Sequence, residues 1–213
     1  MSMNSLLIEK EIIHTINSYL EENKTFKVKK IIPYINSQIS KKGLNLNQNG
    51  IKSVLSKLLK KKLIVEGSKL TRHDILENSK RQAIYCFVEQ NPGSISNVIM
   101  NEVQVSNYEL YWHLKMLEKF DYIKIGTIQG HTAYFATEVP PKEMNTQYIL
   151  NKPKSKRILF YLEENDIGVT KTKIAEDLSM HFNTVAKYLD LLHNASAIIK
   201  DKKSNQTLYF PKK

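Results

Sequence analysis

Apolar residues recur along this chain in a pattern that repeats at a fixed spacing. Residues 178–210 align with residues 103–135 at a constant offset of 75 positions, and a weaker copy lies upstream at an offset of 59. The matched apolar pairs include Leu110 with Val185, Leu114 with Leu189 and Leu117 with Leu192. A repeat of this length is too long for a solenoid and suits a very small domain. The pattern therefore predicts three similar small domains in a row.

Within the middle copy, the hydrophobic period changes from helical spacing to the short runs of a hairpin. The predicted elements are, in order, a helix over 83–88 ending at Asn91-Pro92-Gly93, a helix capped by Ser96, a helix opened by the capping box Ser106-x-x-Glu109, and two strands, 122–128 and 132–136, around Gln129-Gly130. Pro and Gly stop helices, and a two-residue loop with Gly is typical of a β-hairpin. The middle copy thus predicts three helices followed by a hairpin.

The third copy has the same order of elements, and the first copy is a looser version. The third copy predicts helices around 158–162, 170–178 and 182–192, then a hairpin of strands 197–200 and 207–210. The first copy predicts a helix around 12–20, a second near 28–39, a third capped by Asn47, and a short hairpin of 63–65 and 69–71 bent at Gly67. The second of these helices contains Pro33, which a helix tolerates only in its first turn or at the cost of a kink.

Three helices followed by a β-hairpin is the element order of a winged helix-turn-helix. The predicted fold class is therefore mainly α with small β-hairpins (α+β), built as three tandem winged helix-turn-helix domains. We expect these domains at residues 1–72, 73–140 and 150–213, joined by brief linkers at about 72–78 and 138–153.

The net charge of the chain indicates the class of partner that it binds. The formal net charge is +11, from 32 Lys and Arg against 21 Asp and Glu. Cations predominate in the first and third domains, whereas the middle domain is mildly acidic. A balance this basic indicates a polyanionic partner, either nucleic acid or anionic lipid, and says nothing about the fold.

Cysteine usage and hydropathy bear on location. The chain has one cysteine, Cys86, which excludes an intramolecular disulfide framework and favours a reducing compartment. The N-terminus has no charged-then-apolar signal segment, and no apolar run reaches the ~18 residues of a membrane span. We therefore expect a soluble, cytoplasmic protein.

Catalytic motifs are missing from the sequence. None of the seven glycines belongs to a phosphate-binding loop, and the six histidines are scattered with no pairing to Cys86 that would indicate a metal site. His113 is expected to be a packed helix residue. The sequence thus predicts a protein that is not an enzyme and that has neither a metal nor a cofactor.

Several short stretches carry a resemblance to a known superfamily. The run from Arg81 through Asn91-Pro92-Gly93 to Trp112-His113-Leu114-x-x-Leu117-Glu118 resembles bacterial and archaeal winged-helix transcriptional regulators close to the MarR and ArsR-like groups. In the third copy, Lys173-Ile174-Ala175 and Asn183-Thr184-Val185-x-x-Tyr188-Leu189 resemble the same superfamily. The resemblance implies binding to double-stranded DNA, with the third helix of a domain in the major groove and the hairpin wing against phosphate.

The repeat register shows which residues stand at the base-contacting positions. Asn can bind adenine through two hydrogen bonds, and Lys can reach guanine or phosphate. The DNA-binding candidates in the first domain are Gln48, Asn49, Lys52 and Ser53. Those in the third domain are Lys171, Lys173, His181, Asn183, Thr184, Lys187 and, on the wing, Lys202 and Lys203.

The middle domain departs from this pattern. At the same register it has Tyr108, Glu109 and Trp112. A carboxylate beside DNA phosphates is repelled, whereas Trp and Tyr dominate the energetics of protein interfaces. We therefore expect these three residues to contact a protein, either a partner, another copy or a neighbouring domain.

Two function classes follow from these observations. The favoured one is a DNA-binding transcriptional regulator in which the outer domains grip the duplex and the middle domain contacts protein. The alternative is a protein-interaction scaffold of tandem winged helices, as in membrane-remodelling complexes of the ESCRT-II kind or polymerase-associated factors.

Overall fold

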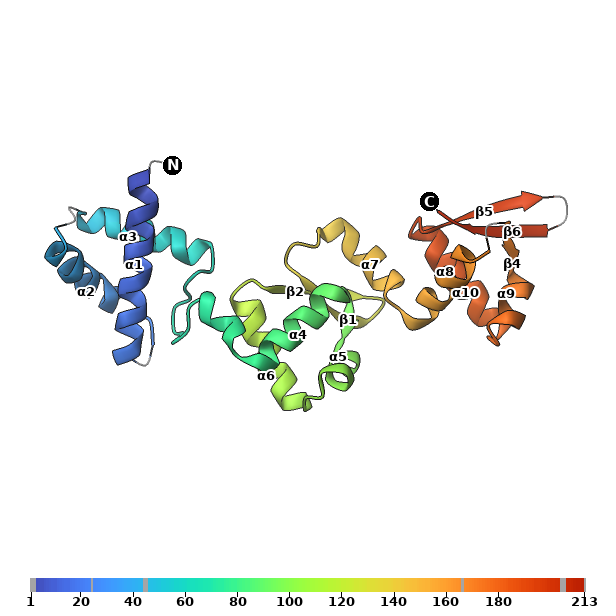
Figure 1. Ribbon diagram of the computed structural model, residues 1–213, viewed down its shortest axis with the longest axis horizontal. Coiled ribbons are helices and arrows are strands. Elements are labelled where there is room, and N and C mark those ends of the chain that lie inside the picture. The colour runs from blue at the N-terminus through green and yellow to red at the C-terminus, as the bar shows by residue number, and fades with distance from the viewer. Residues whose placement is uncertain (1–2, 24, 44–45, 166, 204–205, 213) are drawn as a thin grey trace. The chain divides into compact units, whose positions relative to one another are not determined.

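The protein is mainly helical with small antiparallel sheets, as its hydrophobic pattern predicts (Figure 1). The computed structural model describes residues 3–23, 25–43, 46–165, 167–203 and 206–212. Contacts between residues group the chain into two compact units, Met1–Tyr85 with Tyr108–Tyr122 and Cys86–Asn107 with Ile123–Lys213. The boundaries between these units fall inside the expected middle domain, and the division into three domains stays a prediction.

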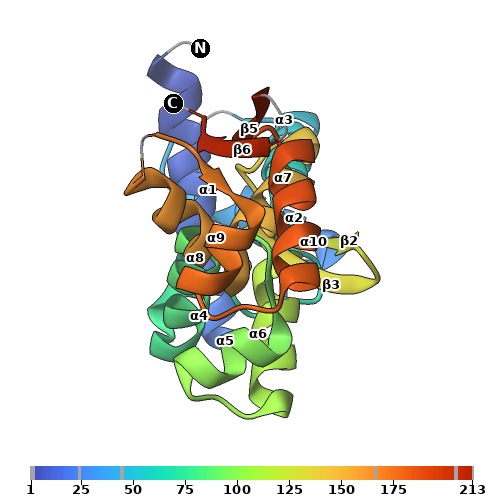
Figure 2. The ribbon, with the colours of Figure 1, turned by 90° about the vertical axis from the view of Figure 1, so that its right-hand side faces the viewer.

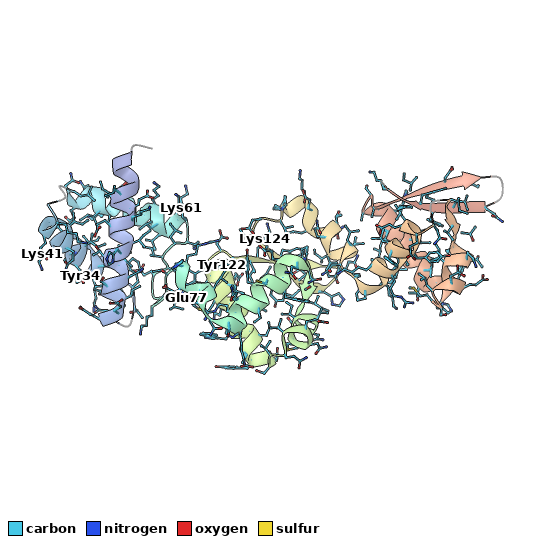
Figure 3. The ribbon with its side chains drawn as sticks, viewed as in Figure 1. Tyr34, Lys41, Lys61, Glu77, Tyr122 and Lys124 are labelled. Atoms are coloured by element: carbon cyan, nitrogen blue, oxygen red, sulfur yellow. The ribbon has the colours of Figure 1, made fainter. Side chains whose placement is uncertain are left out.

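The N-terminal part of the first unit is a bundle of three helices. These are α1 (Met3–Glu22), α2 (Val28–Lys41) and α3 (Gln48–Lys60). Their apolar faces meet in one core that includes Ile12, Ile35 and Leu55, each at most 1% exposed. Tyr34, labelled on α2 in Figure 3, has its ring edge-on to that of Tyr19 of α1, with the ring centroids 5.2 Å apart. The helical spacing of apolar residues in the first copy was therefore a correct guide to all three helices.

Two polar features fix the ends of these helices. Asn47 caps α3 as predicted, because its side-chain oxygen accepts a hydrogen bond from the main-chain nitrogen of Gly50 at 2.8 Å. Ion pairs of Lys42 with Glu11 and of Lys57 with Glu9 join α1 to the end of α2 and to α3. Pro33 lies inside α2, beyond its first turn, so α2 lacks the hydrogen bond that this residue's nitrogen would donate.

The hairpin expected in the first copy is reduced to one antiparallel bridge, between Ile64 and Thr71. The strands predicted at 63–65 and 69–71 do not form. The bend between them pairs with another segment, because the main-chain nitrogen of Gly67 donates to the oxygen of Phe26 and the nitrogen of Phe26 donates to the oxygen of Ser68, both at 2.8 Å. A short 3-10 helix, η1 (His73–Glu77), then buries Ile75 where a plain linker was expected.

The middle copy contains the predicted helices and hairpin. Its elements are α4 (Ser79–Gln90), β1 (Ser94–Ile95), α5 (Ser96–Val103), α6 (Asn107–Lys119), β2 (Ile123–Ile128) and β3 (His131–Ala136). Strands β2 and β3 pair over their full length around Gln129 and Gly130, whose φ angles are +52° and +78°, as a tight hairpin turn requires. Strand β1, which sequence reasoning missed, pairs with the outer edge of β3.

One predicted cap in this copy is wrong by one residue. Ser96 is the first residue of α5, and the N-cap position belongs to Ile95, whose side chain makes no capping hydrogen bond. The hydroxyl of Ser96 lies 3.3 Å from that of Tyr134 on β3 instead. The serine therefore links α5 to the sheet and does not cap the helix.

The last part of the second unit repeats the order of helices and hairpin. Its elements are η2 (Pro141–Glu143), α7 (Met144–Leu150), α8 (Pro153–Glu163), β4 (Val169–Thr170), α9 (Lys171–Asp177), α10 (Phe182–Asn194), β5 (Ile198–Lys203) and β6 (Gln206–Pro211). In Figure 2 this part faces the viewer. Helices α8, α9 and α10 lie together, and the β5–β6 hairpin lies beside them. Strand β4 completes a three-stranded sheet in the order β4-β6-β5.

The segment expected to be a linker at 138–153 is only partly one, because it contains η2 and α7. Tyr148 and Ile149 of α7 are buried in a core that also contains Phe135 of β3 and Ile158 of α8. The three prolines of this segment, Pro140, Pro141 and Pro153, stand outside α7 and start the helical elements η2 and α8. Among the described residues, no helix is both long and apolar enough to cross a membrane.

Candidate nucleic-acid interface

A helix-turn-helix is formed by α9, the turn 178–181 and α10. Ile174 of α9 and Val185 and Leu189 of α10 are fully buried and fix the two helices on their shared core. The turn passes through Ser179, whose φ is +50°, and the guanidinium of Arg157 donates to the main-chain oxygen of Leu178 at 2.8 Å. The helix-turn-helix is therefore held in place by packing and by a hydrogen bond from α8 to the turn.

The first turns of α10 present polar side chains to solvent. His181 is the N-cap, and its Nδ1 accepts a hydrogen bond from the main-chain nitrogen of Asn183 at 3.2 Å. His181, Asn183 and Lys187 are exposed, and Thr184 is half-buried. Because Val185 and its apolar neighbours face the core, these four predicted DNA-binding residues lie together on the outer side of the helix.

The two predicted lysines of α9 differ in how free their charges are. Lys171 places its ammonium 4.3 Å from the centroid of the Phe182 ring at the start of α10. Lys173 instead forms an ion pair with Asp177 at 2.7 Å, one helical turn further along α9. Part of the positive charge of Lys173 is thus already balanced within the protein, whereas that of Lys171 lies beside α10.

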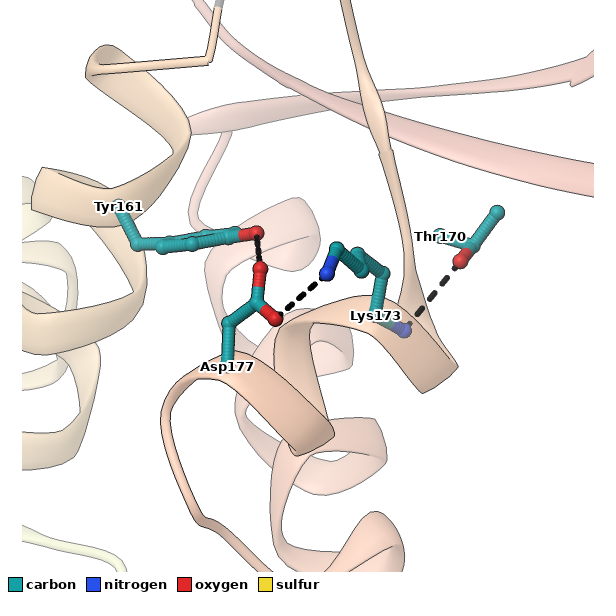
Figure 4. A network of polar contacts seen from close by, with 4 residues as sticks. All are labelled: Tyr161, Thr170, Lys173 and Asp177. Atoms are coloured by element: carbon teal, nitrogen blue, oxygen red, sulfur yellow. Dashed lines mark hydrogen bonds and ion pairs between the residues drawn. The ribbon is translucent and has the colours of Figure 1, made fainter.

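A small polar network surrounds this ion pair (Figure 4). The hydroxyl of Tyr161 donates to Asp177 at 2.5 Å, and Thr170 caps α9 by accepting from the main-chain nitrogen of Lys173 at 3.3 Å. Hydrogen bonds from Lys173 and then Tyr161 lower the pKa of Asp177, whereas the bond to Asp177 raises the pKa of Tyr161 to about 12. The network links α8 to α9, so its role is to position the helix-turn-helix.

The β5–β6 hairpin supplies the wing. Strand β5 packs against α10 and carries Lys200 and the exposed Lys202, which pair across the ladder with Tyr209 and Thr207. The side chain of Lys203 lies outside the described residues. Strand β5 ends three residues beyond the predicted strand 197–200, which lengthens the cationic strand of the hairpin.

Sequence reasoning missed two further lysines near α10. Lys152 directly precedes α8. Its pKa is lowered first by burial and then by the nearby charge of Lys187. Lys154, in the first turn of α8, has its ammonium 6.0 Å from the centroid of the Tyr188 ring of α10. The only sequence signal was the basic run Lys152-Pro153-Lys154-Ser155-Lys156, which straddles the end of the expected linker.

The first unit holds a second candidate surface on α3. Gln48, Asn49, Lys52 and Ser53 are all exposed in the first two turns of that helix. Ile51, Leu55 and Leu58 are buried on its opposite side. The structure thus brings these four predicted residues together at the capped end of α3.

The solvent-exposed side of α6 differs in chemistry from the exposed sides of α3 and α10. Tyr108 is 82% exposed and Trp112 is 47% exposed, while Glu109 forms an ion pair with Lys80 at 2.6 Å. Tyr111, which sequence reasoning missed, is also 66% exposed. Large apolar rings left in solvent at this density are typical of contact surfaces. Aromatic residues therefore dominate the side of α6 that corresponds to the polar side of α10.

Two buried basic residues lie beneath these aromatic rings. Arg81 donates to the main-chain oxygen of Ile75 at 2.8 Å, and its guanidinium carbon lies 5.1 Å from the centroid of the Trp112 ring. His113 is buried as expected, and its Nδ1 has no hydrogen-bond partner among the described residues. Burial first, and then the charge of Arg81, lowers the pKa of His113.

Within the described part of the chain, no group of three or more His, Cys, Asp or Glu side chains could hold a metal ion. Cys86 is a free thiol of intermediate burial. Polar recognition and apolar contact are therefore the chemistry that these surfaces offer.

Comparison with known proteins places the chain near one class. No family model matches it. Over 141 residues it is 26% identical to an uncharacterized HTH-type transcriptional regulator of Methanocaldococcus jannaschii. The aligned stretch is 66% of this chain and 35% of that protein, so the chain spans about a third of its relative's length. The chain is thus an α+β protein with sequence similarity to a helix-turn-helix regulator.

A chain of the ESCRT-II endosomal trafficking complex is similar over 98% of this chain and 93% of its own length. The sequence identity is 14% and the TM-score is 0.24. At that TM-score no conclusion about fold or function rests on the likeness.

Proposed function

We propose that the protein is a DNA-binding transcriptional regulator made of tandem winged helices, at residues 1–72, 73–140 and 150–213. The observation that carries the proposal is the outer side of α10, where Asn183, Thr184 and Lys187 stand together on a helix whose other side is core. Amide and ammonium groups at the start of such a helix are suited to base edges and phosphates of the major groove. Similarity to an HTH-type regulator supports the same function.

The cationic hairpin and the flanking lysines supply the phosphate contacts in this proposal. Lys202 on β5 and Lys171 on α9 flank α10, and Lys152 and Lys154 extend the cationic surface along the start of α8. Contacts of this kind set the register of a protein on the duplex without reading sequence. Lys173 contributes less, because Asp177 already balances its charge.

The start of α3 is the second DNA contact in the proposal. Gln48 and Asn49 are hydrogen-bonding groups suited to adenine, and Lys52 is placed one turn later for phosphate. The outer domains then grip DNA, and α6 contacts a protein through Tyr108, Glu109 and Trp112.

The exposed aromatic face of α6 also favours the second candidate function, a protein-interaction scaffold. Tyr108 and Trp112 are the residue types that anchor interfaces, and Glu109 disfavours DNA at that position. In that case the basic surfaces of α3 and α10 would serve an acidic protein partner, and duplex DNA would not bind.

Fluorescence anisotropy with a random-sequence duplex of about 40 base pairs, titrated across salt concentration, separates the two functions. We expect binding with a log–log slope of about −4 or steeper, because several phosphates are neutralised at once. Replacing Lys52, Lys171, Lys187 and Lys202 by Gln should flatten the slope. Lys142→Gln, at an exposed lysine of η2 outside these surfaces, is the matched control. No binding at low salt would rule out the regulator and favour the scaffold.

A further inference from the structure

The solvent-exposed side of α6 carries aromatic rings followed by cations along one line. Tyr108, Tyr111 and Trp112 are exposed on its first two turns, and Lys115 and Lys119 continue the same side of the helix. Residues spaced by three or four, and then by seven and eleven, lie on one face of an α-helix. These five residues are called the α6 stripe below. Its first half is apolar and its second half is positively charged.

The two lysines of the stripe have no carboxylate partner among the described residues. The ammonium of Lys115 lies 6.0 Å from the centroid of the Tyr111 ring, and neither Lys115 nor Lys119 forms an ion pair there. Glu109 is already paired with Lys80 of α4, at 2.6 Å. On α6 and the first turn of α4 cations outnumber carboxylates, the cations being Lys80, Arg81, Lys115 and Lys119 and the carboxylates Glu109 and Glu118. The stripe therefore has positive charge left for a partner.

Arg81 of α4 adds a buried cation beneath the stripe. It is 2% exposed, and its guanidinium carbon lies 5.1 Å from the centroid of the Trp112 ring. Its Nη1 donates to the main-chain oxygen of Ile75, and its Nε has no hydrogen-bond partner among the described residues. A buried charge is costly unless an opposite charge pairs with it. Because water and salt screen a buried charge poorly, Arg81 attracts an anion placed over Trp112.

Rings beside unpaired cations suit a partner that combines carboxylates with apolar side chains. We infer that the α6 stripe binds an acidic segment of a partner protein, in which carboxylates alternate with apolar residues. The inference rests on the proposed role of α6 in protein contact and names the chemistry of the partner. The carboxylates contact Lys115 and Lys119 and lie in the field of Arg81. The apolar side chains of the partner pack on Tyr108 and Trp112, which removes those rings from water.

Two other occupants match the stripe less closely. A second copy of this chain would bring the same cations to the contact, and the chain as a whole has a net charge of +11. A single strand of nucleic acid could stack its bases on the rings. Its phosphates recur at every nucleotide, however, and would meet Glu109 and Glu118, which flank the stripe on its two sides. An acidic protein segment can place its carboxylates at the lysines alone.

Intrinsic fluorescence tests this assignment on the full chain, because Trp112 is its one tryptophan. The probes are two synthetic peptides of equal length, built from the repeated unit Asp-Asp-Phe-Leu or from its uncharged isostere Asn-Asn-Phe-Leu. We expect the acidic peptide to shift the emission of Trp112 to shorter wavelength, since it covers a ring that is 47% exposed. It should bind at least about tenfold more tightly than the isostere, because charge-assisted hydrogen bonds are the stronger kind.

Substitution of the stripe lysines tests the source of that preference. Lys115→Gln with Lys119→Gln should bring the two peptide affinities to within about threefold of each other. Lys29→Gln with Lys30→Gln, at exposed lysines of α2, removes the same charge and should retain the preference. Circular dichroism establishes that both variants are folded. Retention of the preference in the folded stripe variant would overturn the assignment.

Four further results would each overturn it. The first is an unchanged Trp112 emission at millimolar acidic peptide, and the second is equal binding of the two peptides, which would leave α6 a protein contact without charge selection. The third is an oligothymidylate of the same length that shifts the emission as tightly as the acidic peptide does. The fourth is a shift on concentrating the protein alone, which would identify a second copy as the occupant. Duplex anisotropy reports on α3 and α10, whereas Trp112 emission reports on α6, so failure of DNA binding is seen separately.

Discussion

Helices α6 and α10 occupy the same position in two copies of one repeat, yet their outer sides are chemically opposite. Their inward residues correspond: Leu110, Leu114 and Leu117 of α6 and Val185, Leu189 and Leu192 of α10 are all buried. Outward, α6 carries Tyr108 and Trp112 where α10 carries Asn183 and Lys187. The inward half of each helix is constrained by packing, and the outward half is free to specialise.

This difference separates what the repeat preserves from what it does not. The apolar positions that recur at an offset of 75 are the positions that form cores, and they say little about partners. Solvent-facing side chains decide whether a helix of this kind can approach phosphate or must avoid it. Each substitution below alters either the buried side or the solvent-exposed side of α6 or α10.

The largest effect is expected from the inward half. Leu189→Ala removes a fully buried side chain and should lower the free energy of unfolding by about 2–5 kcal/mol, as core truncations do. Leu114→Ala, at the equivalent position of α6, should do the same. Chemical denaturation followed by circular dichroism measures both. A loss under ~1 kcal/mol at either site would mean that the two helices are not packed alike.

A smaller effect is expected from the outward half of α10. Lys187→Gln should weaken DNA binding by about tenfold at low salt and reduce the log–log salt slope by about one, because one phosphate contact is lost. Trp112→Gln, at the matched position of α6, should leave both quantities unchanged. Anisotropy titrations at several salt concentrations provide the measurement, and equal losses in the two variants would remove the distinction between the helices.

The outward half of α6 should matter for assembly. Trp112→Ala removes a ring that is 47% exposed, so stability should change little while any self-association or partner binding weakens. Light scattering across a concentration series detects the change in mass. DNA affinity per site should stay nearly constant. If DNA binding collapses while the oligomeric state is fixed, α6 does not serve protein contact.

The smallest effect concerns pH and the packed side of α6. The folded-state pKa of His113 is lowered from 6.5 by burial, so the unfolded chain takes up a proton at higher pH than the folded protein does. Stability from the neutral imidazole is therefore fully present above about pH 6.5 and is lost as pH falls toward the folded-state pKa. Thermal unfolding of the wild type and His113→Leu between pH 7.5 and 5 should show a shallower acid loss in the variant. Parallel curves would assign the loss to other groups.

Most of the fold could be predicted because periodicity encodes it directly. Long amphipathic helices such as α1 and α10, and the Gln129-Gly130 hairpin, depend on local spacing and turn chemistry. Helix α7 could not be predicted, since it is short, polar in its first turns and flanked by prolines. It is stabilised by the burial of Tyr148 and Ile149, which is a tertiary effect. The two-residue strands β1 and β4 have too few residues to show any period.

Some features of the candidate surfaces could likewise be predicted from the sequence, and others depend on tertiary packing. The outer residues of α10 and α3 could be found from sequence because polar positions on an amphipathic helix face solvent. The proximity of Lys152 to Lys187 could not, because it depends on how α8 and α10 pack. The i,i+4 spacing of Lys173 and Asp177 is a sequence signal for their ion pair, which the sequence analysis missed, whereas the hydrogen bond of Tyr161 to Asp177 leaves no such signal.

The core shared by Phe135, Tyr148 and Ile158 has a consequence for inheritance. The second and third copies repeat at an offset of 75 residues, but this core runs through the joint between them, by way of α7. A gene segment encoding only residues 150–213 would therefore leave behind side chains on which its own helices pack. An exchange of the last repeat between proteins would therefore have to carry α7 and Phe135 of β3 with it to keep this core intact.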